Sequence, residues 1–372
     1  MSVIVTPFPS ALHPEVAAGK SFSYKVVHSS GSTFSVINYG ASITNIFVPD
    51  KNGQWKDVIL GFSDLDAYLD SNSCHGAIVG RHANRIKDAA FSIGEIEYHV
   101  TKNDGLNNLH SGLHGFHNIF WQGSVLPKEP AQAMLQESHI DNPFELDGDA
   151  VLLTCVSPDQ SNGFPGNLTT SVLYAWTTDQ TLLILYRGES DKDTLFNPTN
   201  HAYFNIGGHD SGSVELHRLW IESNKVTNKD YENVPDGTYT DVRGTIFDFT
   251  VPNPLGPTMT SQHPQILSSL GIDQNYCLST TVDAVRRVAQ LSDPDSGIIM
   301  EVLTNSPGLQ IYTGNHMDYL GKGGVHYAPF GGVCLETQEY PNAINHSNFP
   351  SPILPAHKPR YYMTGFRYSI ES

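Results

Sequence analysis

The sequence predicts an all-β protein, and three features of the chain support this. Short segments rich in β-branched and aromatic residues recur throughout, separated by turn residues that include many of the 32 glycines and 23 prolines. No stretch repeats its apolar residues at the helical period over several turns. The chain also has no low-complexity linker, charge block or internal repeat. Many short strands predict a sandwich or a barrel, and two wide antiparallel sheets would hold all 372 residues in one domain.

The first predicted strand region is 33–48, which Gly40 interrupts, and an Asn-Gly hairpin turn follows at 50–53. Residues 63–71 predict one short helix with Ser63 as its N-cap. The region 91–100 alternates around Gly94 as a hairpin does. Further strands are predicted at 169–177, 181–187, 214–222, 284–291, 298–304 and 309–313. A turn at 294–297 is predicted to join 284–291 to 298–304.

The chain is strongly acidic, with 21 basic and 38 acidic residues and a formal net charge of −17. Nucleic acids and anionic membrane surfaces would repel such a chain, so neither is expected as a partner. No apolar stretch approaches the length of a membrane span. A neutral small-molecule substrate is indifferent to this charge, whereas a phosphorylated one would need a local basic pocket.

The four cysteines, Cys74, Cys155, Cys277 and Cys334, are scattered and form no CxxC pair. Neither a zinc ribbon nor a dense disulfide framework is therefore indicated. The N-terminal residues lack a basic segment followed by a long apolar run, so no secretory signal is expected. These features predict a cytoplasmic protein. The sequence does not decide between a monomer and a homodimer.

The segment 197–208, NPTNHAYFNIGG, places His201 in a stiff, aromatic-flanked stretch. Pro198 fixes its own backbone and disfavours helix for the residue before it. Imidazole titrates close to neutrality, so His201 is a candidate general acid or base. Alternatively, it is a core histidine whose hydrogen bonds are satisfied. Tyr203 and Phe204 would contact a ligand or belong to the core.

Asn84 and Arg85 lie in the segment GRHANRI, residues 80–86. The guanidinium of Arg85 offers a planar fork of donors that suits hydroxyls or a carboxylate. A structural Arg–carboxylate pair is the alternative. Three histidines then follow in 107–121, at His110, His114 and His117. Gly112 and Gly115 oppose a continuous helix there and no HExxH motif is present, so a metal site is not expected.

Two carboxylates complete the candidate set. Asp248 lies between Phe247 and Phe249 on a predicted strand, where it would either accept hydrogen bonds from a ligand or face solvent. Glu336 follows the apolar run 333–335, a setting that raises a carboxyl pKa by desolvation and suits a general base. A buried structural glutamate is equally consistent. Nucleotide-binding loops and a GxSxG nucleophile elbow are absent from the sequence.

These segments together resemble the aldose 1-epimerase family, also called galactose mutarotases. The motifs that carry the resemblance occur in the family's order, from about residue 30 to the C-terminus: GRHANRI, NNLHSGLHGF, GFPGNL, NPTNHAYFN, GTIFDF, GIDQNY, LQIYTGN and CLETQEYPNAINHSNFPS. The resemblance implies a large antiparallel β-sandwich in one domain, residues 1–372. It also implies interconversion of the α and β anomers of free aldohexoses such as galactose and glucose, without a cofactor or metal.

The resemblance assigns Glu336 as the catalytic base and His201 as the catalytic acid, with His110 as a further active-site histidine. It assigns sugar contacts to Asn84, Arg85, Asp248 and Gln310. Two positions beside His110 depart from the usual pattern, because Ser111 replaces a glycine and His117 replaces an aspartate. These departures bear on the sugar preference rather than on the acid–base pair.

Two alternatives remain open from the sequence. A hexose-6-phosphate 1-epimerase of the same fold would need a basic cluster, and Arg85 has no obvious basic companions near it. A non-catalytic carbohydrate-binding protein would need no acid–base pair, so the presence of both Glu336 and His201 argues against it.

Overall fold

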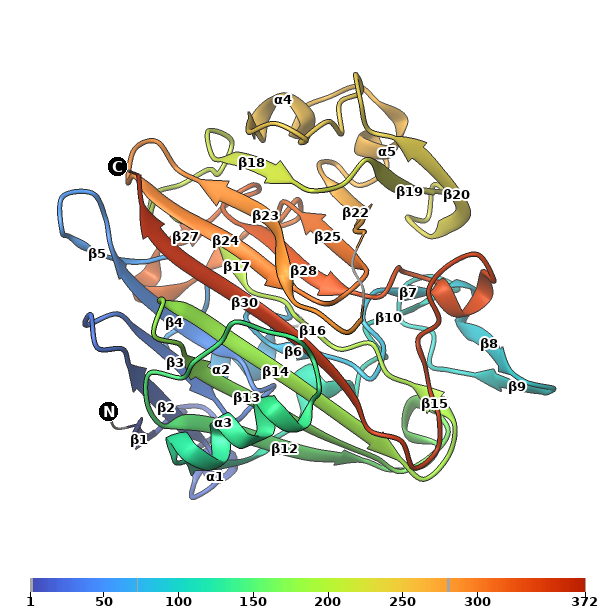
Figure 1. Cartoon of the computed structure of the whole chain (residues 1–372), viewed down its shortest axis with the longest axis horizontal. Coiled ribbons are helices and arrows are strands. Elements are labelled where there is room, and N and C mark those ends of the chain that lie inside the picture. Colours follow the sequence, from blue (N-terminus) through green and yellow to red (C-terminus); the bar gives the residue numbers. More distant parts are fainter. Residues whose placement is uncertain (1–2, 72, 280–281, 372) are drawn as a thin grey trace.

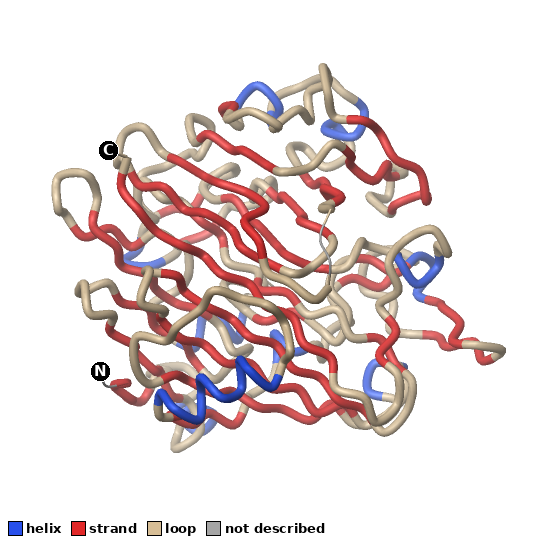
Figure 2. Tube along the Cα trace, in the orientation of Figure 1, coloured by secondary structure: helices blue, strands red, loops and turns tan. Residues whose placement is uncertain are grey.

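The computed structural model describes residues 3–71, 73–279 and 282–371, and it is built almost entirely of antiparallel sheets (Figures 1 and 2). The largest sheet has nine strands. In spatial order they are β11 (Gln122–Leu126), β12 (Ala150–Ser157), β13 (Leu168–Trp176), β14 (Thr181–Ser190), β30 (Arg360–Ile370), β24 (Ile298–Thr304), β23 (Arg286–Ser292), β18 (Arg218–Ile221) and β21 (Asn253–Pro254).

A six-stranded and a five-stranded sheet form the opposing layer. The six-stranded sheet runs in the order β17 (Tyr203–Phe204), β28 (Val333–Gln338), β25 (Gly308–Tyr312), β22 (Asp273–Cys277), β19 (Lys225–Lys229) and β20 (Pro235–Asp241). The five-stranded sheet comprises β1 (Val3–Pro7), β2 (Phe22–Val27), β3 (Thr33–Ile37), β4 (Ile43–Pro49) and β5 (Trp55–Asp57).

Five two-stranded ladders complete the described sheets. They pair β6 (Ile78–Val79) with β16 (Thr199–Asn200), β7 (Arg85–Ile86) with β10 (Asn108–Leu109), β8 (Ala90–Ile93) with β9 (Ile96–His99), β15 (Thr194–Leu195) with β29 (Ile353–Leu354), and β26 (Tyr319–Leu320) with β27 (His326–Tyr327). The β8–β9 hairpin projects from the body of the molecule (Figure 1).

One apolar core joins the nine-stranded sheet to the other two. Phe204 of β17 packs on Phe366 of β30 at a ring distance of 4.7 Å, and Phe34 of β3 packs on Tyr174 of β13 at 6.4 Å. Burial of such rings removes large apolar areas from water and contributes most of the stabilisation. The predicted antiparallel sandwich is therefore confirmed.

Most predicted strands are confirmed, including the hairpin 91–100 and the pair 169–177 and 181–187. The region 33–48 forms β3 and β4, and Gly40 occupies the turn between them with a φ of +64°. The prediction at 214–222 was too long, because only β18 over residues 218–221 joins the sheet.

The helix predicted at 63–71 is confirmed except for its N-cap, and one further helix was not predicted. The helix at 63–71 exists as α2 (Leu65–Asp70), but Asp64 caps it by accepting a hydrogen bond from the Ala67 amide, in place of Ser63. The ten-residue helix α3 (Lys128–Glu137) was not predicted. Its fully buried residues are Ala131 and Leu135, one helical turn apart, and Met134 packs partly buried beside them against the outer face of the nine-stranded sheet. This stripe is too short to give a clear period.

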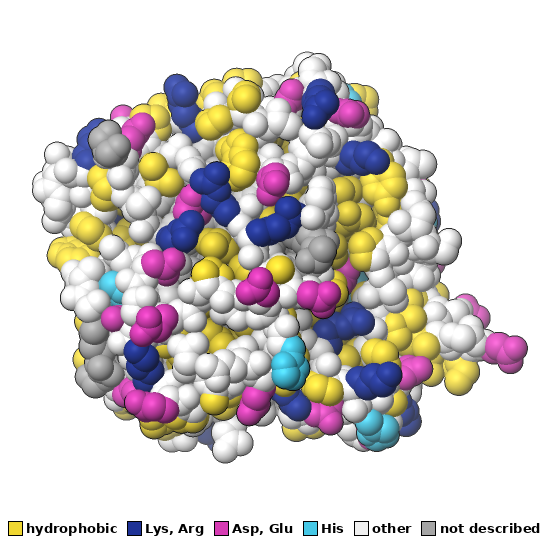
Figure 3. All heavy atoms as spheres, viewed as in Figure 1, with side chains coloured by type: hydrophobic (Ala, Val, Ile, Leu, Met, Phe, Trp, Pro, Cys, Tyr) yellow, Lys and Arg dark blue, Asp and Glu magenta, His cyan; other side chains and the backbone are white. Residues whose placement is uncertain are grey.

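The other helices are single turns: α1 (Pro14–Ala17), α4 (Gly256–Met259), α5 (Pro264–Leu267) and the 3₁₀ segments Lys87–Ala89, Phe116–Asn118, Ser161–Gly163, Lys322–Gly324 and Ala343–Asn345. No helix within the described ranges is long and apolar enough to cross a membrane. On the face of the nine-stranded sheet shown in Figure 3, basic and acidic side chains are interspersed, so no basic stripe for a polyanion is seen there.

Candidate active site

The outward face of the six-stranded sheet forms the floor of a cavity of about 350 Å³. Side chains alternate across a strand, so Leu335 and Ile311 point into the apolar core while their neighbours point into or beneath the cavity. Strand register places one row of side chains across four strands: Tyr203, Cys334, Tyr312 and Asp273. The next row along the strands holds Glu336 and Gln310.

Six residues from the predicted set and its surroundings line this cavity: Asn84, Arg85, His110, His201, Asp273 and Glu336. They come from β7, β22, β28 and three loops, and several lie at strand ends. The fold therefore gathers the chemically active side chains of distant segments at one hollow.

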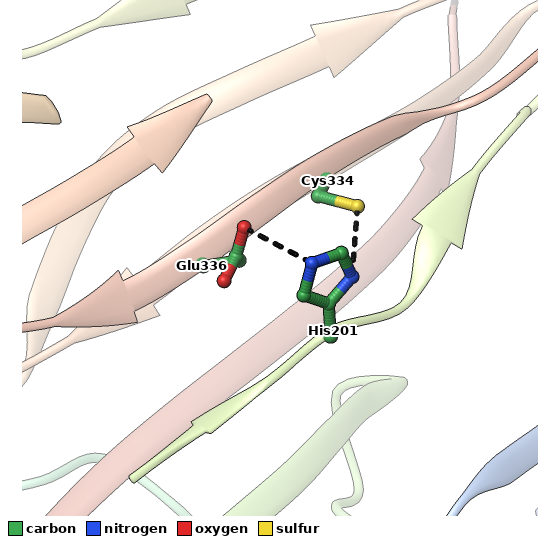
Figure 4. Close-up of side chains that lie close together, drawn as sticks. All are labelled: His201, Cys334 and Glu336. Carbon is green, nitrogen blue, oxygen red and sulfur yellow. Dashed lines mark hydrogen bonds and ion pairs between the residues drawn. The ribbon is translucent and has the colours of Figure 1, made fainter. Parts of the chain in front are cut away.

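Glu336 and His201 lie together at the cavity floor (Figure 4). Oε1 of Glu336 is 3.7 Å from Nε2 of His201, and the two side chains are only 2% and 7% exposed. Burial raises the pKa of Glu336 well above its ordinary value, and the neighbouring Asp273 raises it further. Burial also lowers the pKa of His201 to about 4. Desolvation of both groups thus outweighs their mutual attraction.

The loop between β16 and β17 holds His201 by its backbone. The His201 amide donates to the carbonyl of Ala77, and the Gly76 amide donates to the carbonyl of His201. The side-chain amide of Asn200 adds a hydrogen bond of 2.7 Å to the Gly76 carbonyl. These contacts fix the imidazole relative to the sheet that carries Glu336, which is what an acid–base pair requires.

Asn84 and His110 are held as a unit at one side of the cavity. The Asn84 amide donates to Nδ1 of His110 at 3.1 Å, and the His110 amide donates to the Asn84 carbonyl at 3.2 Å. An amide can only donate, so Nδ1 is the acceptor and the proton of neutral His110 resides on Nε2. Burial lowers the pKa of His110 well below its ordinary value, so it remains a neutral donor.

Arg85 bridges two carboxylates at the cavity wall. Its Nε donates to Asp104 at 2.7 Å, and Nη1 lies 3.6 Å from Asp273. Burial alone would raise the pKa of Asp273, but the charges of Lys229 and Arg85 outweigh that effect and lower it. Asp273 is therefore a carboxylate, able to accept hydrogen bonds from hydroxyls.

The structure does not bring Asp248 into the cavity. Its carboxylate accepts hydrogen bonds from the Gly244 amide and from the amide and hydroxyl of Thr250, so it closes a local turn. Asp248, expected from sequence to contact the sugar, does not line this cavity, whereas Asp273 does. Phe247 and Phe249, on either side of Asp248, pack into the core, so neither ring marks a ligand site.

Gln310 lies behind the site rather than at its surface. It is 4% exposed, its Nε2 donates to Oδ1 of Asp273 at 2.5 Å, and it pairs with Glu336 across β25 and β28. This geometry orients Asp273, in place of the direct sugar contact expected from sequence. Of the two aromatic candidates, Tyr203 lines the cavity and Phe204 belongs to the core.

The chain matches a family model described as aldose 1-epimerase over residues 23–367. The chain belongs to the aldose 1-epimerase family. Galactose mutarotase from Bos taurus is 35% identical over 337 residues, which are 90% of this chain and 90% of that protein. The crystal structure of an aldose epimerase homologue from C. elegans is similar with a TM-score of 0.81, at 25% identity, covering 94% of this chain and 98% of that chain.

A second solved structure supports the fold of this aldose 1-epimerase family member. Galactose 1-epimerase from Lactobacillus acidophilus gives a TM-score of 0.82 at 24% identity and covers 100% of both chains. The resemblance read from the motifs is therefore confirmed, together with the galactose-mutarotase-like fold.

Of the two departures from the usual family pattern, Ser111 has hydrogen-bond partners, whereas Nδ1 of His117 is buried without one among the described residues. The Ser111 hydroxyl accepts from the His82 amide at 2.8 Å and donates to the His82 carbonyl at 3.1 Å, while its own φ is +65°. His117 is half-buried behind the cavity wall, and burial lowers its pKa to about 4. Neither residue lines the cavity of this family member.

The geometry gives little support to a metal at the acid–base pair. One ligand atom from each of His201, Cys334 and Glu336 falls within 4.8 Å of the others. Cys334 contacts Nδ1 of the imidazole, however, whereas Glu336 faces Nε2. An ion bound to one nitrogen would lie away from the donor on the other. Among the loop histidines, His114 is exposed and His110 is already bonded to Asn84.

Sequence analysis missed several residues of the site, most importantly Asp273, Asp104 and Cys334. Asp273 opens β22 within the motif GIDQNY, so a carboxylate at a strand start after a glycine was the available signal. Asp104 lies in a turn and Cys334 in an apolar run, where nothing local distinguishes them from ordinary residues.

Proposed function

We propose that this chain interconverts the α and β anomers of free aldohexoses such as galactose and glucose, with Glu336 as general base and His201 as general acid. The observation that supports this most is the buried Glu336–His201 pair, 3.7 Å apart at the floor of a cavity of about 350 Å³. The activity agrees with the family to which the chain belongs.

Anomer exchange requires one proton to leave the C1 hydroxyl while another reaches the ring oxygen O5. Carboxylate Glu336 takes the first proton, and imidazolium His201 gives the second, so that O5 does not leave as an alkoxide. The open aldehyde turns about C1–C2, and closure with reversed proton transfers gives the other anomer. A positioned proton transfer contributes about 10²–10⁴ in rate.

The proton count of the pair fits both halves of the reaction. With Glu336 protonated and His201 neutral, the state favoured by burial, the pair holds one proton. Carboxylate with imidazolium also holds one proton, so the two states are tautomers. The first is the state that ring opening leaves behind and ring closure consumes. Hydroxyls of a bound sugar would stabilise the charged tautomer by hydrogen bonding to it.

The remaining lining residues would orient the sugar. The Asp273 carboxylate would accept from its hydroxyls, Arg85 and the Nε2–H of His110 would donate, and Asn84 would support His110. Binding holds C1 against Glu336 and O5 against His201. The activation barrier is then lower because the entropy of alignment has already been lost on binding. Gln310 would act through Asp273.

A phosphorylated substrate is less well supported. Arg85 is the only lysine or arginine among the described cavity-lining residues, while Asp104, Asp273 and Glu336 are acidic. Arg85 already serves two of these carboxylates. A sugar phosphate dianion would add repulsion without a free cation to offset it.

Polarimetry tests the proposal. The decay of optical rotation of freshly dissolved α-galactose and α-glucose, corrected for spontaneous mutarotation, should accelerate in proportion to enzyme concentration. Absence of acceleration with both sugars, in protein that has normal circular dichroism, would leave a carbohydrate-binding role as the better explanation.

We also infer a single domain, a cytoplasmic location and a monomer or homodimer. One apolar cluster extends from Tyr24 to Tyr368, which supports the single domain. All four cysteines are free, as is usual in a reducing compartment.

A further inference from the structure

Cys334 lies against the candidate acid, on the same strand as the candidate base. It precedes Glu336 by two residues on β28, so both side chains point to the same face of the sheet. It is fully buried and lies opposite Tyr203 on β17 and Tyr312 on β25. The thiol is therefore surrounded by residues of the site and is held by the core strand of the sheet.

The imidazole of His201 is placed between these two side chains (Figure 4). Sγ of Cys334 is 3.4 Å from Nδ1, within reach of a hydrogen bond to sulfur, whereas Oε1 of Glu336 is 3.7 Å from Nε2. Each ring nitrogen thus has a different partner. In a neutral imidazole, the partner of one nitrogen decides which nitrogen carries the proton.

We propose that Cys334 is a positioning residue whose sulfur accepts the Nδ1–H of His201, so that Nε2 is always the nitrogen that exchanges a proton with the sugar. This inference rests on the proposed function, because it concerns the acid of that reaction.

The chemistry of the thiol suits this role. Burial raises the pKa of Cys334 well above its ordinary value, so the sulfur stays a neutral thiol. A neutral sulfur is a weak acceptor. A carboxylate at the same place would stabilise the imidazolium and make it a poorer acid. The thiol therefore orients the ring with little effect on its acidity.

The proton balance is simple. During ring opening the proton leaves Nε2 for O5, while the Nδ1–H remains on the sulfur side. During ring closure the lone pair of Nε2 takes the proton of the open-chain hydroxyl back. No bond to sulfur forms and no electron is transferred. Without the acceptor, the neutral ring would also populate the Nε2–H tautomer, which cannot take that proton.

The test uses Cys334→Ala, Cys334→Ser and a matched control, Cys155→Ala. Cys155 is likewise a buried cysteine on a paired strand, β12 of the nine-stranded sheet, where it belongs to the apolar core. Protein labelled with ¹⁵N in histidine reports the tautomer of His201 without any sugar, and His201→Asn assigns the signal by its loss. Polarimetry over a range of pH gives kcat and KM for each variant.

The wild-type protein should show His201 as the Nδ1–H tautomer, and Cys334→Ala should shift it toward Nε2–H. In the same variant kcat should fall about tenfold, which is part of the rate acceleration that a positioned proton transfer typically contributes. KM should be nearly unchanged. Cys334→Ser keeps an acceptor and should recover most of the tautomer preference. Cys155→Ala should change neither the tautomer nor the pH profile.

A wild-type Nε2–H tautomer would overturn the inference, as would a Cys334→Ala protein with unchanged tautomer and pH profile. These results are separate from failure of the proposed function. If His201→Asn keeps the wild-type rate, the acid is assigned wrongly, whatever the spectrum shows for Cys334.

Discussion

Oε1 of Glu336 and Nε2 of His201 are 3.7 Å apart, slightly farther than a direct hydrogen bond. The gap matters because the two groups must exchange protons with a sugar rather than with each other. Both side chains are nearly inaccessible to water, so neither can be ionised alone without cost. The pair is therefore best treated as one titrating unit, in which burial favours protonated Glu336 and neutral His201.

Substitution of either partner should remove most of the catalysis. Glu336→Gln keeps the shape but cannot take a proton, and His201→Asn keeps a hydrogen bond but cannot act as an acid. Each should lower kcat by about 10²–10⁴. The double variant should lose little more, because both residues act in one concerted step. Polarimetry on α-galactose measures all three, and a single variant with a near wild-type rate would redirect the assignment toward His110.

The rate should be bell-shaped against pH, with an alkaline limb well above the ordinary histidine value of 6.5. At low pH, His201 gains a second proton near its lowered pKa of about 4, and no base remains. At high pH the pair loses its only proton. This loss is moved to a higher pH because burial raises the pKa of Glu336. The measurement is kcat/KM by polarimetry from pH 4 to 10, corrected at each pH for spontaneous mutarotation. An alkaline limb near pH 6.5 would refute the prediction.

Asp273→Asn should raise KM for galactose by about tenfold or more, since loss of a hydrogen bond to a charged group is worth roughly 1.5–3 kcal/mol. Asp248→Asn is the matched control, because Asp248 only closes a turn outside the cavity. Initial rates over a range of galactose concentrations measure both variants. An effect of Asp248→Asn as large as that of Asp273→Asn would restore the sequence-based assignment.

Hexose 6-phosphates should be turned over much more slowly than the free sugars, because the described cavity wall holds three carboxylates and one arginine. The check is kcat/KM for glucose and glucose 6-phosphate under one ionic strength, since salt screens the repulsion. Equal or higher values for the phosphate would favour the hexose-6-phosphate epimerase alternative.

The buried ion pair between Lys322 and Asp57 should contribute strongly to stability. Nζ of Lys322 is 2.6 Å from Asp57, and both side chains are under 10% exposed. Lys322→Met would leave Asp57 unpaired and lower the free energy of unfolding by about 3–5 kcal/mol. Lys128→Met, which breaks an exposed pair with Glu145, should change it by less than about 1 kcal/mol. Urea denaturation compares the two, and equal losses would contradict the burial argument.

The sequence by itself determined the sandwich class and most strand positions. It also singled out Glu336, His201, His110, Asn84 and Arg85 as candidates, and the structure places them around one cavity. Those signals are local, because alternation, turn residues and motifs are written in consecutive positions. Helix α3 was missed because its buried stripe has only two residues.

Only the tertiary structure separated Asp273 from Asp248 and assigned Gln310 a supporting role. Asp248 closes a turn with Gly244 and Thr250, whereas the register of β22 against β25 places Asp273 beside Tyr312 at the cavity. The tertiary structure also decided the direction in which the pKa values of Glu336 and His201 are shifted. Attraction between the two groups and desolvation by the surrounding sheet oppose each other, and their balance depends on burial and distances that side chains acquire only when four separate strands come together.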